Sequence, residues 1–74
     1  MPDYFEAREM LRDALRQIAV HHANQDARTW AERALAELSP WTVYKTLCHL
    51  SDNAFDKLGE FFFDCVRAGG FDHA

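Results

Sequence analysis

Apolar residues recur at steps of three and four along most of the chain, which is the period of an amphipathic helix. The pattern divides into four segments and predicts helices over residues 4–22, 26–38, 40–50 and 52–68. Strand-like alternation and long linkers are absent from the sequence. Because the connections are short, neighbouring helices are expected to pack antiparallel or at a sharp angle. The sequence therefore predicts an all-α fold, a compact three- to four-helix array that forms a single domain over residues 1–74.

Capping residues support these helix boundaries. Asp3 stands three residues before a glutamate, which is the spacing of a capping box. Ser39 and Pro40 end one helix and start the next, as its N-cap and its first helical residue. Gly69 predicts a left-handed C-cap after the last helix, and Phe71 is placed to fold back over it.

Each predicted helix has one apolar face. The residues expected on these faces are, helix by helix, Tyr4, Ala7, Met10, Leu11, Ala14, Leu15 and Ile18; Ala27, Trp30, Ala31, Ala34, Leu35 and Leu38; Trp41, Tyr44, Leu47 and Cys48; and Ala54, Phe55, Leu58, Phe61, Phe62, Cys65 and Val66. Phe5 and Phe63 fall outside these faces. Gly59 lies within the last helix, where it costs up to ~1 kcal/mol relative to Ala. We expect another backbone to approach it closely.

Composition adds a reason to expect a partner. The chain has 74 residues, of which 49% are hydrophobic and 14% aromatic. A domain this short buries only about 60% of the surface of its unfolded chain, so apolar surface is expected to remain for a partner or for a second copy in a homodimer. Two cysteines are too few for a disulfide framework, and no apolar run approaches ~18 residues. Because the first residues lack a basic and then an apolar region, we expect no signal peptide. A cytoplasmic protein with free thiols is expected.

The sequence shows no pattern of catalytic, cofactor-binding or metal-binding residues. Adjacent ligands such as His21-His22 and Cys48-His49 point in different directions on a helix, whereas a zinc site needs paired ligands at a suitable spacing. Both cysteines fall on predicted apolar faces, where a thiol is inert. A glycine-rich phosphate loop is also absent. We therefore predict no enzymatic activity, no cofactor and no metal.

The clearest functional signal is a charge pattern on the last helix. Asp52, Asp56, Glu60 and Asp64 follow each other at steps of four and form an acidic row. Like charges at this spacing destabilise an isolated helix by a few tenths of a kcal/mol per pair, so a basic surface is expected to face the row. Phe63 lies beside it, and aromatic residues next to charged ones are typical of interfaces. These five residues are the predicted partner-binding site.

Two basic surfaces are candidates to face the acidic row. Arg8, Arg12 and Arg16 form an equally regular basic row on the first helix. Together with Phe5, this row is a possible counter-surface within the monomer or across a dimer. The other candidate is external, a basic groove of a nucleic-acid-handling protein in which carboxylates take the place of phosphates. A solvated helix face with loose pairing is the third interpretation.

Residues 39–50 suggest an alternative function. The first nine of them, Ser-Pro-Trp-Thr-Val-Tyr-Lys-Thr-Leu, followed by Leu50, resemble the recognition helix of winged-helix regulators, which often reads S-x-x-T-V-Y-R-T-L. The resemblance implies DNA contacts through Thr42, Tyr44 and Lys45. It covers only this short segment, and no pattern for a β-wing follows it. Lys45 is the only basic side chain besides a histidine, whereas phosphate binding needs several.

We interpret the chain as an acidic helical protein–protein interaction module that regulates or inhibits a larger partner by occlusion. Its net charge is −4, which favours a partner with a basic surface over nucleic acid or membrane. Small acidic helical proteins of this size are often phage or mobile-element inhibitors of bacterial machinery, such as anti-CRISPR proteins. That expectation rests on size and charge, not on a resemblance. The alternative is a small helix-turn-helix DNA-binding transcriptional regulator.

Overall fold

The computed structural model describes residues 3–72 and contains four helices in that range: α1 (Tyr4–His21), α2 (Gln25–Ala36), α3 (Pro40–Leu47) and α4 (Asp52–Arg67). No strand occurs within the described part of the chain. The all-α prediction is therefore confirmed, with each helix at its predicted place.

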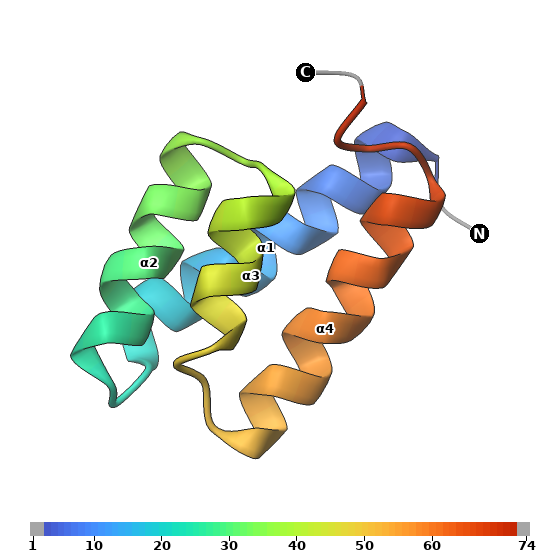
Figure 1. Cartoon of the computed structure of the whole chain (residues 1–74). Helices are drawn as coiled ribbons and strands as arrows, with labels where there is room; N and C mark the ends of the chain where they lie inside the picture. Colours follow the sequence, from blue (N-terminus) through green and yellow to red (C-terminus); the bar gives the residue numbers. More distant parts are fainter. Residues whose placement is uncertain (1–2, 73–74) are drawn as a thin grey trace.

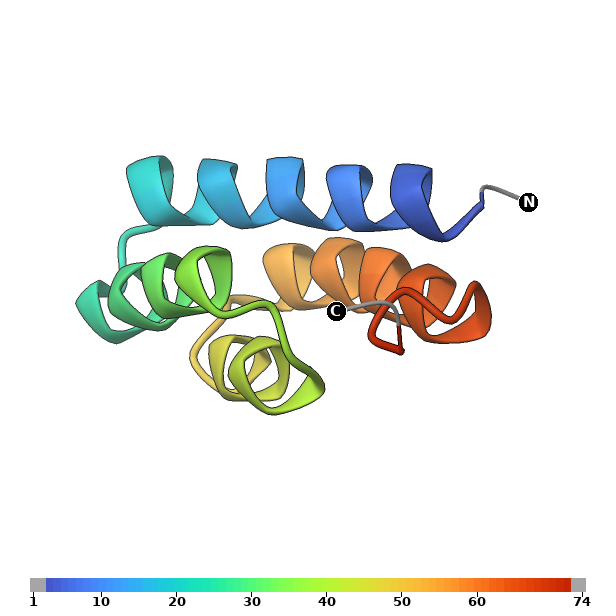
Figure 2. The same ribbon diagram turned by 90° about the horizontal axis from the view of Figure 1, so that it is seen from above.

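The helices are arranged in three levels (Figures 1 and 2). α1 forms one side of the molecule, and both α2 and α4 pack against it. α3 lies on the side away from α1, where it packs mainly against α2. In Figure 1, α3 therefore stands between α2 on the left and α4 on the right. This arrangement leaves a long flank of α4 without a covering helix.

The core lies where α1, α2 and α4 meet and extends under α3. Its buried apolar residues are Ala7, Leu11, Leu15 and Ile18 from α1, Ala27, Ala31 and Ala34 from α2, Val43 and Leu47 from α3, and Leu58 and Cys65 from α4. The α2 contribution consists only of alanines, whose short side chains let neighbouring helices approach closely. The predicted faces of α1 and α2 thus supply most of the core.

Side-chain caps begin three of the helices. The carboxylate of Asp3 accepts a hydrogen bond from the Glu6 backbone N–H at 2.8 Å. Asn24 caps the first amides of α2, and Ser39 forms a capping box with Thr42 at the start of α3. Each of these bonds pairs amides that have no partner within their own helix. The predicted starts therefore hold, with α2 beginning one residue early.

All four helices end earlier than predicted, α1 and α4 by one residue, α2 by two and α3 by three. Local hydrogen bonds explain the two larger differences. α2 ends at Ala36 because the Thr42 hydroxyl donates to the carbonyl of Glu37 at 2.8 Å, which satisfies the end of the helix from outside. α3 ends at Leu47 because the chain then tightens: the next amides bond to carbonyls only three residues back, as in His49 to Thr46. The predicted helix to residue 50 was too long.

The buried side of α3 differs from the prediction. Trp41, Tyr44 and Cys48, which were expected inside, are exposed. Thr42 and Thr46 are buried in their place, next to the valine and leucine of the same helix. Each threonine hydroxyl donates to a backbone carbonyl at 2.8 Å, so its burial leaves no unpaired polar group. Hydrophobicity alone therefore did not predict which side of α3 is buried.

α4 buries less than its sequence suggests. Leu58 and Cys65 are fully buried, but Phe55 and Val66 are about half exposed, contrary to the prediction. Gly59 faces open space, since a Cβ built there would have nothing within 4 Å. The expected close approach to Gly59 by another part of the chain is therefore wrong. The physical reason is the placement of the short α3 against α2, which leaves this flank of α4 uncovered.

The predicted glycine C-cap of α4 is confirmed. Gly69 adopts a left-handed conformation with a φ of 72°. Gly70 N–H donates to the carbonyl of Cys65 at 2.8 Å, which is the long bond of a Schellman motif. Phe71 folds back onto Phe62, with ring centroids 5.6 Å apart.

Candidate functional site

The uncovered side of α4 is the most distinctive surface of the described chain. We call it the outer face of α4 and define it as Asp52, Phe55, Asp56, Gly59, Glu60, Phe63, Val66 and Arg67. At 100° per residue most of these positions lie on the side of the helix opposite Leu58 and Cys65, which anchor the helix in the core, while Phe55 and Val66 lie at the edges of the face. The geometry of one amphipathic helix therefore separates residues for stability from residues that face solvent.

Phe63 is the apolar centre of the outer face. It is 67% exposed, as its position outside the predicted apolar face indicated. Gly59 lies one turn before it, and Phe55 one turn before Gly59, so two exposed aromatic rings flank a position without a side chain. Because nothing lies within 4 Å of a Cβ at Gly59, a partner can come close to the backbone there.

Three of the four predicted carboxylates lie on the same face as these two rings and form no ion pair among the described residues. Asp52, Asp56 and Glu60 are exposed, and none forms an ion pair within residues 3–72. Asp64 differs, because its side chain is partly covered and pairs with Arg67 at 2.6 Å. The acidic row is therefore three unpaired carboxylates followed by one that is neutralised on its own helix.

The basic row of α1 does not face the acidic row in the monomer. Arg8 donates to the carbonyl of Gly70 at 2.6 Å, which ties α1 to the turn after α4. Arg16 pairs with Asp13 on its own helix at 2.5 Å. Arg12 is partly buried, and its Nε has no hydrogen-bond partner among the described residues. Within the described residues, the arginines of α1 therefore form no ion pair with the acidic row of α4.

A second charged surface, which the sequence reading missed, lies between α2 and α3. We call Trp30, Arg33, Trp41 and Lys45 the cation–aromatic cluster. The two indole rings meet edge to face with centroids 6.3 Å apart. The Arg33 guanidinium lies 4.7 Å from the Trp30 centroid, and Lys45 Nζ lies 5.2 Å from that of Trp41. Cations favour such positions over aromatic faces.

The contacts of α3 leave few of the predicted DNA-contacting residues available in the segment that resembles a recognition helix. Thr42 is buried and hydrogen-bonded, so it cannot contact DNA as predicted. Lys45 lies over the two indole rings, and only Tyr44 of the three predicted contact residues points into solvent without a cation–aromatic partner. The two tryptophans are the sequence signal for this cluster. They could have indicated it only if the packing of α2 against α3 had been known.

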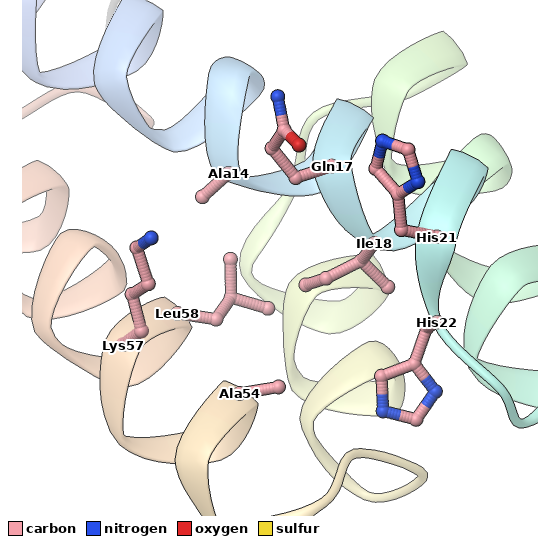
Figure 3. Close-up of a pocket in the computed structure, with 8 residues that line it drawn as sticks. All are labelled: Ala14, Gln17, Ile18, His21, His22, Ala54, Lys57 and Leu58. Atoms are coloured by element: carbon pink, nitrogen blue, oxygen red, sulfur yellow. The ribbon is translucent and has the colours of Figure 1, made fainter.

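A hollow of about 270 Å³ opens between α1 and α4 (Figure 3). Ile18 and Leu58 form its apolar floor, and His21, His22 and Lys57 lie at its rim. His22 also joins two turns, because its Nδ1 faces the N–H of residue 24 at 3.0 Å and its Nε2 faces that of residue 51 at 3.2 Å. A neutral imidazole accepts at one nitrogen only, so the ring satisfies one amide at a time.

The two thiols have different surroundings. Cys65 is fully buried, and burial raises the pKa of its thiol, an effect that nearby Arg8 partly offsets. Its thiolate is therefore disfavoured, as expected of a core residue. Cys48 is exposed, so its predicted burial is wrong.

Metal-ligand groups and membrane-spanning helices are two further features that the described residues bear on. Within residues 3–72, no three His, Cys, Asp or Glu side chains are grouped so that they could hold a metal ion. No helix in this part of the chain combines the length and apolar character needed to cross a membrane.

Comparison with protein families, with curated proteins and with solved structures gives no match. Function is therefore inferred from the surfaces of the molecule.

Proposed function

We propose that the chain is a protein-interaction module that binds a basic surface of a partner protein through the outer face of α4. One observation carries the proposal: three exposed carboxylates without an intramolecular ion pair share the outer face of α4 with the exposed ring of Phe63, and Glu60 lies one turn from that ring. Neither feature contributes to the core, and like charges at this spacing act against the helix itself.

The parts of the face have distinct roles in this proposal. Phe63 is the anchor, since large buried aromatic residues supply much of the binding energy of interfaces. Asp56 and Glu60 form the charged rim, which attracts Lys and Arg of the partner and speeds encounter. Gly59 leaves room for a partner backbone or a bulky side chain between Phe55 and Phe63.

The proposed consequence of binding is occlusion. A row of carboxylates on a rigid helix fits a basic groove that normally holds phosphates, because carboxylates and phosphates both present negative charge at regular spacing. A partner covered in this way loses access to its own ligand. This is the action expected of a small inhibitor of bacterial machinery, such as one encoded by a phage or mobile element.

Charge reversal tests the proposal directly. The double variant Asp56→Lys/Glu60→Lys is compared with Glu9→Lys/Glu32→Lys, which makes the same change of charge at exposed positions of α1 and α2. Asp64 is kept, because its pair with Arg67 belongs to the helix. Tagged proteins capture partners from host lysate, and quantitative mass spectrometry compares the bound proteins.

We expect the α4 variant to lose its specific partners by at least about ten-fold and the control to retain them. Circular dichroism should show the same helicity for both, since all four positions are exposed. Equal capture by the two variants at equal helicity would overturn the proposal.

A further inference from the structure

The chain carries two aromatic surfaces of opposite charge. The outer face of α4 combines Phe63 with unpaired carboxylates, whereas the cation–aromatic cluster combines two indole rings with Arg33 and Lys45. α4 and α2 flank α3 on opposite sides, so the two surfaces belong to different parts of the molecule (Figure 1). No ion pair joins them within residues 3–72.

The cluster is the one place where cations gather without acidic partners among the described residues. The chain has eight Lys and Arg residues. Five of them bond to backbone carbonyls or carboxylates or are partly buried in α1: Arg8, Arg12, Arg16, Arg28 and Arg67. Lys57 is isolated among carboxylates on α4. Arg33 and Lys45 remain, both held over indole rings.

The surroundings of the cluster also suit an acidic partner. Residues 38–51 contain no Asp or Glu, although the chain has twelve such residues. Trp41 is 60% exposed, and Tyr44 on the same side of α3 is 56% exposed. The α3 side of the surface thus offers apolar area and positive charge without a carboxylate, whereas on the α2 side Glu37 follows Arg33 by four residues but forms no ion pair with it.

We propose that the partner of the outer face of α4 includes a second copy of this chain, bound through its cation–aromatic cluster. The inference rests on the proposed function of the outer face. In the contact, Asp56 and Glu60 of one copy face Arg33 and Lys45 of the next, and Phe63 packs against the exposed tryptophan. Edge-to-face packing of aromatic rings favours such a contact.

This association is head to tail, because the two surfaces in contact differ. A dimer formed in this way leaves one surface of each kind unused, so further copies add to form a ring or an open chain. Self-association covers the same face that the proposed partner needs. The monomer, which predominates in dilute solution, is therefore the form that binds another protein. Self-association at high concentration competes with that binding.

Analytical ultracentrifugation of three proteins and one mixture tests the proposal. The first variant, Asp56→Lys/Glu60→Lys, lacks the acidic surface and keeps the cluster. The second, Arg33→Gln/Lys45→Gln, lacks the cations and keeps the acidic surface. Trp41→Ala serves as a further cluster variant if the second one loses helicity, because truncating an exposed side chain leaves the core unchanged.

Wild-type protein should sediment faster as its concentration rises over roughly a hundred-fold range, and less so at high salt. Each variant alone should remain monomeric. An equimolar mixture should form a heterodimer that does not grow, because only one pair of complementary surfaces is left.

Monomeric wild-type protein at every concentration would overturn the inference. So would a wild-type dimer that persists in both variants, which would indicate a symmetric contact elsewhere. A mixture without heterodimer would overturn it as well. None of these results affects the capture experiment, since loss of partner proteins on reversal of Asp56 and Glu60 would still support the proposed function.

Discussion

α1 and α4 carry charge rows of equal regularity, and the structure uses them in different ways. Arg8, Arg12 and Arg16 lie along α1 at steps of four, as the carboxylates do along α4. Two of the arginines bond within the monomer, Arg8 to the turn after α4 and Arg16 to Asp13 on its own helix. Arg12 is partly buried, which keeps it from an exposed role. Asp52, Asp56 and Glu60 have no such contacts among the described residues.

The difference shows what a charge row in a sequence can indicate. Spacing identifies the face of a helix, but it does not say whether that face is used for folding or for binding. Contacts decide the matter, because a side chain already bonded within the monomer contributes to stability and is not available to a partner. Substitutions that separate stability from binding can test this distinction on each helix.

The largest expected effect comes from the core side of α4. Leu58→Ala removes a fully buried side chain, so we expect a loss of about 2–5 kcal/mol in the free energy of unfolding. Phe63→Ala, on the opposite side of the helix, should change it by no more than ~0.5 kcal/mol. Urea denaturation followed by circular dichroism measures both. A large loss for Phe63→Ala would mean that this ring belongs to the fold.

The two glycines of α4 and its C-cap should respond in opposite directions. A Cβ at Gly70 would collide with the Sγ of Cys65 and crowd Arg8, so Gly70→Ala should destabilise the protein by about 1–3 kcal/mol. Gly59→Ala meets open space and should stabilise α4 by up to ~1 kcal/mol. Thermal unfolding measures both changes.

Gly59→Ala also tests the binding role of that position. If a partner approaches the backbone there, the more stable variant should bind the partner less well. Unchanged binding by Gly59→Ala would show that the gap between Phe55 and Phe63 is not part of the contact.

Arginines of the α1 row should differ in their contributions to stability. Arg8→Met loses a partly buried charged hydrogen bond to Gly70, and we expect a loss of about 1–3 kcal/mol. Arg16→Met breaks only an exposed pair with Asp13, which is worth at most about 1 kcal/mol. Equal effects of the two substitutions in urea denaturation would contradict the view that the row is used unevenly.

The smallest expected effect concerns pH. Burial raises the pKa of Cys65 in the folded protein, so the folded state holds this proton more tightly than the unfolded state. Its contribution to stability is therefore complete below pH 9.0, the ordinary value, and falls as the pH rises above it. The melting temperature should fall more steeply in alkaline buffer for wild-type protein than for Cys65→Ala.

Thiol labelling gives an independent check of the same contrast. Iodoacetamide should modify the exposed Cys48 in the folded protein and reach Cys65 only after unfolding. Equal labelling of both thiols under native conditions would contradict the buried position of Cys65.

The sequence predicted the helices well because local signals define them. The caps at Asp3 and Ser39 and the glycine after α4 act within a few residues, so their effect does not depend on the rest of the fold. The faces of α1 and α2 were also predictable, since both helices have a simple apolar stripe.

The errors on α3 and α4 arise from contacts between helices. Thr42 and Thr46 are buried because their hydroxyls find carbonyl partners, a condition that hydrophobicity does not describe. Phe55 is exposed because α3 packs against α2 instead of covering α4. The cation–aromatic cluster joins side chains from two helices, so no periodicity within one helix reveals it.

The outer face of α4 is tested most directly by two phenylalanines of almost equal exposure. Phe63 is 67% exposed beside the unpaired carboxylates, and Phe5 is 65% exposed on α1. Partner capture by Phe63→Ala and by Phe5→Ala is measured against wild-type protein. Because both variants lose an exposed ring, a difference between them reports the position of the ring on the molecule. We predict that Phe63→Ala lowers capture by at least about ten-fold and that Phe5→Ala leaves it unchanged. Equal capture by the two variants would contradict the account.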